Sequence, residues 1–301
     1  MPEWNPEVEV DVARARALVG AQFPELAGAP MRQLATGWDN VVHLVDERWV
    51  FRFPRRAVAV PGIEREIDVL PRLAPNLPLP VPLPRFVGEP EGDYPWPWFG
   101  AAHLRGVELA ESGWSDAERV IVGAEVGAFL RELHAGRLAG RVGPTLPVDP
   151  MRRADMPFRV AATRKRLVDL AAMRLWEPTN EVDALLADAS NLPPPPRTSV
   201  LHGDLHVRHV LVDGGHVTGI IDWGDVCVGD PSIDLSLAYG SRLGDSRSAL
   251  VEAYGPIDGL TELRARVIAV FLAAALLAYA DDQRLASLRA EALRALERAV
   301  A

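Results

Sequence analysis

The sequence has very little lysine. Lys165 is the only lysine among 301 residues, and every other basic side chain except histidine is arginine. A mechanism that depends on a lysine therefore has one candidate, and that candidate lies in the segment TRKRL with no glycine before it. This excludes a Walker A phosphate-binding loop, which requires the pattern GxxxxGK[ST].

Cysteine and long apolar runs are also scarce. Because Cys227 is the only cysteine, no intramolecular disulfide can form, and we expect a reducing, cytoplasmic setting. The N-terminal stretch MPEWNPEVEVDV lacks the basic and apolar regions of a signal peptide. The most apolar run, Val267–Ala280, has fourteen residues, whereas a membrane span needs ~20. We expect this run to form a buried core helix.

Positive charge is in deficit, with 32 lysine and arginine residues against 41 aspartate and glutamate residues and a formal net charge of -9. A general nucleic-acid-binding protein would need a basic face, so this class is disfavoured. The composition fits a neutral or cationic small-molecule partner better. We expect a monomer with neither a nucleic acid nor a membrane as its partner.

The first hundred residues predict a small sheet. Residues 7–19 mix acidic and apolar side chains in the manner of an opening helix. An alternating block follows, in which Gly37–Asn40 (GWDN) and Asp46–Arg48 (DER) are typical of hairpin turns. The third strand is WVFRFP, and Pro54 ends it.

A helix and a further strand pair complete this region. Apolar residues recur with helical spacing over Ile63–Leu73, where Pro71 is expected to kink or shorten the end. Strands are expected near Arg85–Val87 and Trp98–Leu104. From Trp114 on, the pattern becomes mostly helical. We therefore predict an α+β fold with a sheet-containing N-terminal lobe, residues 1–103, and a mostly helical C-terminal lobe, residues 104–301.

The stretch VLHGDLHVRHVLVD, at Val200–Asp213, contains three histidines with Asp204 among them. On a helix, His202, His206 and His209 would share one face and could bind zinc. Gly203 and the downstream pattern VLVDGGHVTGIIDW, which is typical of a β-hairpin turning at Gly214-Gly215, oppose a helix. A zinc hydrolase therefore stays open as the less favoured interpretation.

The favoured interpretation rests on two aspartates. Asp204 lies at the edge of one short apolar strand, and Asp222 lies eighteen residues later in GIIDWGD. A hairpin would bring both carboxylates to the same end of the structure. One carboxylate can then accept the proton of an attacking hydroxyl while the other holds Mg²⁺ on nucleotide phosphates. Phosphoryl transfer needs little beyond this positioning and charge neutralisation.

These motifs resemble those of the aminoglycoside and macrolide phosphotransferases, which are relatives of the protein kinases. HGDLH is similar to the catalytic loop of that family, with Asp204 in the place of the catalytic base. IIDWGD is similar to its metal-binding segment, with Asp222 as the ligand, and GDPSIDLS continues the pattern. The resemblance implies a two-lobed protein-kinase-like fold and an ATP- or GTP-dependent phosphotransferase.

The resemblance extends to the N-terminal lobe. It implies that Arg52 in WVFRFPRR clamps the nucleotide phosphates and that Glu66 is its ion-pair partner, although Arg55 or Arg56 could compete. Arginine replaces the more usual lysine and keeps the charge. Gly37 would belong to the nucleotide loop. Backbone groups near Ala102, His103 and Leu104 would bind the base in a cleft between the lobes.

The chain departs from the kinase pattern at one metal ligand. An asparagine normally stands five residues after the catalytic aspartate, and this chain has His209 there. The resemblance implies that Asp222 and His209 hold Mg²⁺. Because Mg²⁺ prefers oxygen to an imidazole nitrogen, we expect either one strongly bound metal in place of two, or tolerance of Mn²⁺. Three features resemble the pattern of macrolide-type members: the histidine at this position, WVFRFPRR and DPSIDL. The motif GWDN instead resembles the pattern of aminoglycoside-type members.

The expected reaction is transfer of the γ-phosphoryl group to a hydroxyl of a small molecule, with an aminoglycoside antibiotic as the first candidate. A macrolide or a small metabolite is the alternative acceptor. A catalytically silent nucleotide-binding module also stays open, because both the lysine and the asparagine are replaced. Asp230 and Asp234 are expected to support the catalytic loop and cap a helix. His206 is either a substrate contact or an exposed loop residue.

Overall fold

The structure is a computed structural model that describes residues 6–37, 39–241 and 244–301. Its contacts divide the chain into two compact units. The first unit contains the described residues up to Pro75, together with Pro80–Leu104 and Trp223–Asp225. The second unit contains Asn76–Leu79, Arg105–Asp222 and Val226–Ala301.

The first unit is built on a five-stranded antiparallel sheet with the order β1-β2-β3-β5-β4. The strands are β1 (Met31–Thr36), β2 (Asn40–Val45), β3 (Trp49–Pro54), β4 (Pro84–Gly88) and β5 (Trp98–Ala102). Both predicted hairpin turns are confirmed. Asp46, Glu47 and Arg48 lie between the paired residues Val45 and Trp49, and φ values of 54° and 49° at Asp46 and Glu47 reverse the chain there.

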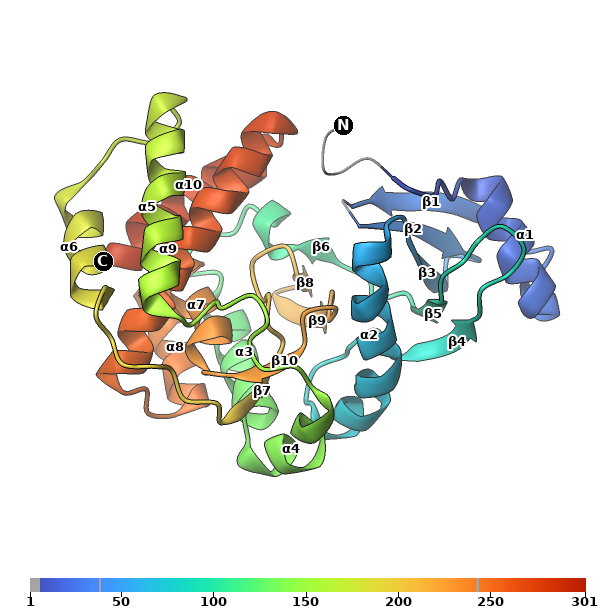
Figure 1. Cartoon of the computed structure of the whole chain (residues 1–301), viewed down its shortest axis with the longest axis horizontal. Helices are drawn as coiled ribbons and strands as arrows, with labels where there is room; N and C mark the ends of the chain where they lie inside the picture. Colours follow the sequence, from blue (N-terminus) through green and yellow to red (C-terminus); the bar gives the residue numbers. More distant parts are fainter. Residues whose placement is uncertain (1–5, 38, 242–243) are drawn as a thin grey trace. The chain divides into compact units, whose positions relative to one another are not determined.

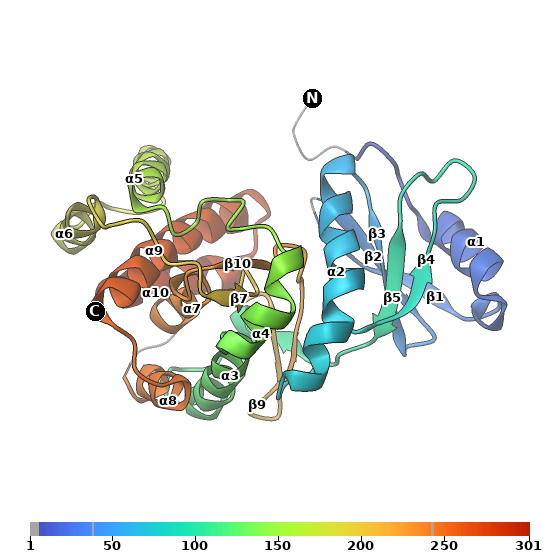
Figure 2. The ribbon, with the colours of Figure 1, turned by 60° about the horizontal axis from the view of Figure 1, so that its bottom comes forward.

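Strand alternation gives this sheet two faces, each covered by a helix (Figures 1 and 2). Phe51 and Phe53 point to the face covered by α1 (Val12–Gln22), where an apolar core forms with Trp98. Phe99 points to the opposite face, where it packs against Ile63 of α2 (Val60–Leu73). Since Arg52 pairs with Phe99 in the register, the alternation places Arg52 on the α2 face.

Two predicted helix boundaries need correction. The opening helix begins at Val12, because the side chain of Asp11 accepts the N–H of Arg14 and caps it. The helix α2 continues through Pro71 to Leu73. Proline lacks a backbone N–H, but so near the end of a helix this removes only one of the last intrahelical bonds.

The second unit is mostly helical, as predicted. Its helices are α3 (Val120–Leu133), α4 (Gly136–Arg141), α5 (Met156–Ala172), α6 (Asn180–Ala189), α7 (Ser232–Gly240), α8 (Asp245–Tyr254), α9 (Gly259–Asp282) and α10 (Ala286–Val300). Helices α3 and α8 lie unusually close. A Cβ atom on Gly127 would lie 2.2 Å from the carbonyl oxygen of Leu250, so this contact requires glycine.

Two small antiparallel sheets carry the motif-bearing segments. β7 (Ser199–Leu201) pairs with β10 (Cys227–Gly229), and β8 (Val210–Asp213) lies between β6 (Val107–Glu108) and β9 (His216–Ile220). The turn at Gly214-Gly215 joins β8 to β9 with φ values of 56° and 89°, as the sequence predicted. The hairpin thus leads from the histidine-rich stretch to Asp222.

The apolar run at Val267–Ala280 lies inside α9, which has 24 residues. The expectation that this segment is too short to span a membrane was wrong. The helix α9 is long and apolar enough to cross a membrane, judged by length and composition alone. Its most apolar window is 56% buried within the structure, where α9 packs against α5, α6, α7 and α10. That packing is the expected core-helix role.

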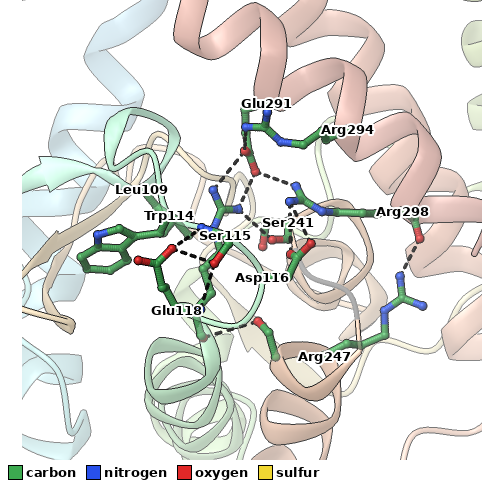
Figure 3. A network of polar contacts seen from close by, with 12 residues as sticks. Leu109, Trp114, Ser115, Asp116, Glu118, Ser241, Arg247, Glu291, Arg294 and Arg298 are labelled. Atoms are coloured by element: carbon green, nitrogen blue, oxygen red, sulfur yellow. Dashed lines mark hydrogen bonds and ion pairs between the residues drawn. The ribbon is translucent and has the colours of Figure 1, made fainter.

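A buried polar network joins α10 to the segment before α3 (Figure 3). Glu291 accepts two hydrogen bonds from Arg119, at 2.5 and 3.0 Å, and a third from Arg298 at 2.8 Å. Arg298 also reaches Asp116 at 3.1 Å, and Arg119 donates to the carbonyl of Ser241. Burial favours a raised pKa for Glu291, but the neighbouring arginines outweigh it and hold the pKa below its usual value.

Candidate active site

The histidine-rich stretch after β7 is a loop and not a helix. His202 is fully buried and its two ring nitrogens bond to backbone: Nε2 donates to the carbonyl of Ile221 at 2.9 Å, and Nδ1 accepts the N–H of Asp204 at 3.3 Å. Burial lowers the pKa of His202, so the ring is neutral. Because both nitrogens are engaged, His202 is not available to complete the three-histidine zinc set.

Asp234 holds this loop in place, as the sequence suggested. Its carboxylate accepts the backbone N–H groups of His202 and Gly203 at 2.8 and 3.0 Å, and His134 Nε2 lies 3.1 Å away. Burial favours a raised pKa for Asp234, but the bond to His134 and the backbone donors hold the pKa below its usual value. The anion therefore fixes the backbone immediately before Asp204.

His209 and Asp222 come together at the end of the hairpin. His209 Nδ1 donates to the carbonyl of Asp204 at 2.8 Å, which leaves the lone pair of the neutral ring on Nε2. That Nε2 lies 3.4 Å from Asp222 Oδ2. Asp222 has a φ of 67°, a conformation that non-glycine residues rarely adopt and that concentrates at functional sites. Two lone-pair donors at this separation suit a shared cation.

Asp204 lies beside an arginine that the sequence interpretation missed. Arg153 belongs to the segment that precedes α5, and its Nη2 donates to Asp204 Oδ1 at 3.1 Å. The opposite oxygen, Oδ2, lies 3.7 Å from His206 Nε2, beyond hydrogen-bond length. The side chain of Asp204 remains 27% exposed, so a ligand can still reach it.

His206 does not behave as an exposed loop residue. Its side chain is only 13% exposed, and its ring lies 3.8 Å from the ring of His209, centroid to centroid. Burial, together with His209 and Arg208, holds the pKa of His206 well below its usual value. Asp204, His206 and His209 place potential ligand atoms within 4.8 Å of one another.

The expected ion pair between Arg52 and Glu66 is present in the first unit. Arg52 donates to Glu66 Oε2 at 3.0 Å, and their side chains are 13% and 1% exposed. Arg55 and Arg56 bond elsewhere: Arg55 donates to the carbonyl of Gly37, and Arg56 donates to Asp39. Of the three arginines, the geometry therefore pairs Arg52 with Glu66.

The other predicted nucleotide contacts are less informative. Gly37 is exposed, but its N–H donates to the carbonyl of Asn40 at 2.8 Å and closes the turn, so this group is not presented to a phosphate. Trp38, in the same motif, lies outside the described residues. Ala102 ends β5, and the N–H of His103 donates to the carbonyl of Arg48. Leu104 is the last residue of the Pro80–Leu104 segment of the first unit.

The segment that follows Asp222 belongs to the first unit and is bonded to α2. Arg65 donates from Nε and Nη2 to the carbonyl of Gly224, at 2.9 and 2.5 Å. A Cβ on Gly62 would lie 3.3 Å from the Cα of Gly224, so the two backbones meet closely. The helix that carries Glu66 thus also holds the chain two residues after the predicted metal ligand.

A cavity of about 550 Å³ in the second unit is separate from these residues. It is lined by the β8–β9 turn, by Gly106 and Val107, and by Trp114 and Glu118. None of the predicted site residues contributes to its lining. The chemistry-bearing residues therefore do not coincide with this hollow.

A comparison with protein families finds one family whose pattern matches most of the chain. The model of the phosphotransferase enzyme family matches residues 30–288. An aminoglycoside 3'-phosphotransferase of Streptomyces fradiae is 33% identical over 168 residues, which are 52% of this chain and 58% of that protein. The uncharacterized protein YcbJ of Bacillus subtilis (strain 168) is 29% identical over 243 residues, 74% of each chain.

Solved structures agree on the fold. The GDP complex of wild-type aminoglycoside 2'-phosphotransferase-IIIa has a TM-score of 0.70 and 21% identity, covering 97% of this chain and 99% of that one. The macrolide 2'-phosphotransferase MphH from Brachybacterium faecium, as apoenzyme, has a TM-score of 0.59 and 25% identity, covering 95% and 97%. These similarities confirm the predicted two-lobed, kinase-like α+β fold.

Proposed function

From the premise that the chain belongs to the phosphotransferase enzyme family, we propose that it transfers the γ-phosphoryl group of ATP or GTP to a hydroxyl of a small molecule. The observation that carries this proposal is the distance of 3.4 Å between His209 Nε2 and Asp222 Oδ2. His209 lies on the same loop as Asp204 and donates to its carbonyl. The cation ligands and the proton acceptor thus come from the two segments that flank the β8–β9 hairpin.

Asp204 acts on the acceptor. Its carboxylate accepts a hydrogen bond from the acceptor hydroxyl, orients that oxygen towards the phosphorus atom and takes the proton as the new P–O bond forms. Asp234 accepts the backbone N–H of Gly203 and so fixes the loop before Asp204. His209 donates to the carbonyl of Asp204 and so fixes the loop after it. Positioning of this kind supplies much of the rate enhancement in phosphoryl transfer.

His209 and Asp222 hold the divalent cation. Their donor set is one imidazole nitrogen and one carboxylate, which would suit Mg²⁺ and would also accommodate Mn²⁺. When bound, the cation neutralises charge on the transferred phosphates. Arg52, held by Glu66, is the residue that we propose contributes a fixed positive charge to the nucleotide phosphates. Backbone groups from Ala102 to Leu104 bind the base.

We propose an aminoglycoside as the first acceptor class to test. The similarity to the Streptomyces fradiae aminoglycoside 3'-phosphotransferase supports this choice. A macrolide is the second candidate, because His209 follows the macrolide-type pattern and the 25% identical macrolide phosphotransferase has the same fold. Small metabolites with a hydroxyl group form the third class. A monomer in the cytoplasm is the setting proposed for all three.

A coupled phosphotransfer screen tests the proposal. Purified protein is incubated with Mg²⁺, ATP or GTP, and each acceptor class, and phosphorylated product is identified by mass spectrometry. We expect product from at least one antibiotic, and Asp204→Asn should reduce kcat by a factor of about 10² to 10⁴. Near-full activity of Asp204→Asn would refute the assignment of the base. Nucleotide binding without transfer to any acceptor would indicate a silent module.

A further inference from the structure

The second unit provides Asp204 with a partner that the reaction described above does not use. Arg153 Nη2 lies 3.1 Å from Asp204 Oδ1, and the arginine side chain is only 12% exposed. We propose that Arg153 is a positioning residue: it holds one oxygen of the catalytic carboxylate so that the other oxygen faces the acceptor hydroxyl. This inference rests on the proposed phosphotransferase activity.

The segment that carries Arg153 is fixed to the sheet behind the catalytic loop. Val148 forms a parallel bridge with Val228 of β10, the strand that pairs with β7. Two hydrogen bonds flank this bridge. The N–H of Val228 donates to the carbonyl of Pro147, and the N–H of Asp149 donates to the carbonyl of Val228. Because β7 leads directly into the catalytic loop, the sheet fixes the distance between the two segments.

The turn after this bridge is constrained by Asp149. Its carboxylate accepts the N–H of Arg153 at 2.8 Å and the N–H of Ala154 at 3.0 Å. Asp149 and Arg152 have φ values of 28° and 51°, so the chain adopts a left-handed turn at non-glycine residues. Such a conformation is strained and persists only where the surroundings enforce it.

A second arginine supports the turn from beneath. Arg159 is buried and donates to the carbonyls of Arg153 and Met151, at 3.2 and 3.1 Å. Burial lowers the pKa of Arg159 to about 10, which leaves it charged at neutral pH. Its guanidinium lies 4.1 Å from the ring centroid of Phe271 in α9. The turn is therefore anchored to the helical core and not only to the sheet.

The chemical consequence concerns the rotation of a carboxylate. Asp204 is 27% exposed, and a solvated aspartate would exchange its two oxygens by rotation about the terminal bond. A charge-assisted bond to Oδ1 opposes that rotation. Oδ2 then lies on the side away from Arg153, where an acceptor hydroxyl can donate to it. Misplacement of a catalytic group by about 1 Å can cost about 100-fold in rate, which sets the size of the expected effect.

The test compares neighbouring arginines of the same turn. Arg153→Ala should reduce kcat by about 100-fold while the KM for the acceptor changes by less than about threefold. Arg152→Ala is the matched control, because Arg152 is exposed and bonds to Asp155 at the start of α5. It should leave kcat within about twofold, as expected for a surface pair. Melting temperature is measured for each variant to confirm folding.

Chemical rescue separates positioning from a structural role. Guanidinium chloride at low millimolar concentration should restore part of kcat to Arg153→Ala, whereas equimolar sodium chloride should not, and neither salt should raise kcat for Arg152→Ala. Arg153→Lys keeps the charge without the planar fork and should retain an intermediate kcat. It also keeps the test decisive if the alanine variant does not fold.

Two results would overturn the inference: an unchanged kcat in both Arg153 variants, or a loss of kcat that guanidinium does not relieve more than sodium does. Either result presupposes turnover by the wild-type protein. If the wild-type protein transfers phosphate to no acceptor, the proposed function itself fails. The two failures are therefore distinguishable.

Discussion

The second unit contains two clusters of charged side chains that differ in the lengths of their contacts. The first, which we call the α10 network, consists of Arg119, Asp116, Glu291, Arg294 and Arg298 (Figure 3). The second, the hairpin cluster, consists of Arg153, Asp204, His206, His209 and Asp222. Both join segments that are far apart in the sequence.

The centre of the α10 network is closed to solvent, whereas Asp116 and Arg294 at its edge are 31% and 49% exposed. Arg119 and Glu291 are each 1% exposed, and Glu291 accepts bonds from three arginines. Removal of a partner from such a network leaves a buried charge without compensation. Its buried centre presents no group to a substrate, and we expect substitutions there to change the stability of the fold.

The hairpin cluster is looser and richer in acceptors. The distances from Asp204 to His206 and from His209 to Asp222 are 3.7 and 3.4 Å, longer than the hydrogen bonds of the α10 network. Asp222 is 45% exposed and has a left-handed backbone. The comparison suggests that substitutions in the hairpin cluster change activity, whereas substitutions in the α10 network change stability.

The largest effect should come from Asp222→Asn. Loss of the carboxylate weakens cation binding, and kcat should fall about 1000-fold, equivalent to ~4 kcal/mol. Asparagine tolerates the left-handed backbone well, so the melting temperature should stay within about 2 °C of wild type. Steady-state kinetics and thermal unfolding check both parts. A large loss of stability in this variant would remove the distinction between the clusters.

Glu291→Gln should show the converse. Arg119 and Arg298 would lose their shared anion, and the free energy of unfolding should fall by ~3 kcal/mol while kcat per folded molecule stays unchanged. Because the pKa of Glu291 is lowered in the folded protein, its contribution is present above the usual glutamate pKa and is lost as the pH falls through the folded value. Urea unfolding at several pH values measures this, with exposed Glu118→Gln as control.

The smallest effect should come from His209→Asn, which introduces the residue usual in kinases. The amide can still donate to the carbonyl of Asp204, so folding should be preserved. An oxygen ligand replaces a nitrogen, and the ratio of Mn²⁺- to Mg²⁺-supported kcat/KM should fall by about tenfold. Titration of both metals at saturating nucleotide measures the ratio. An unchanged ratio would mean that the imidazole does not contact the cation.

Local pattern was sufficient for much of this protein. The strands β2 and β3, their turns and the hairpin at Gly214-Gly215 followed from alternation and turn residues. The helix α2 was predicted from its spacing, but Pro71 was given too much weight, since its missing N–H costs little at a helix end. Asp204 and Asp222 were found because their motifs are short and continuous.

Residues that act from distant segments escaped prediction. Arg153 precedes Asp204 by 51 residues and lies in a segment without a motif, and Arg65 meets Gly224 across 159 residues. In an arginine-rich chain, neither arginine stands out by composition. The only local signal was that MRRAD follows a proline and precedes a helix, which predicts a turn but not its target.

By itself, the sequence determined the kinds of elements, the order of the catalytic motifs and the exclusion of a lysine-based phosphate loop, because these depend on local periodicity and on residues that are present or absent. The tertiary structure decided which charges meet. It paired Arg52 rather than Arg55 or Arg56 with Glu66, because strand alternation turns Arg52 towards α2. It also engaged both nitrogens of His202 with backbone and aimed Nε2 of His209 at Asp222, since hydrogen-bond direction depends on the folded backbone.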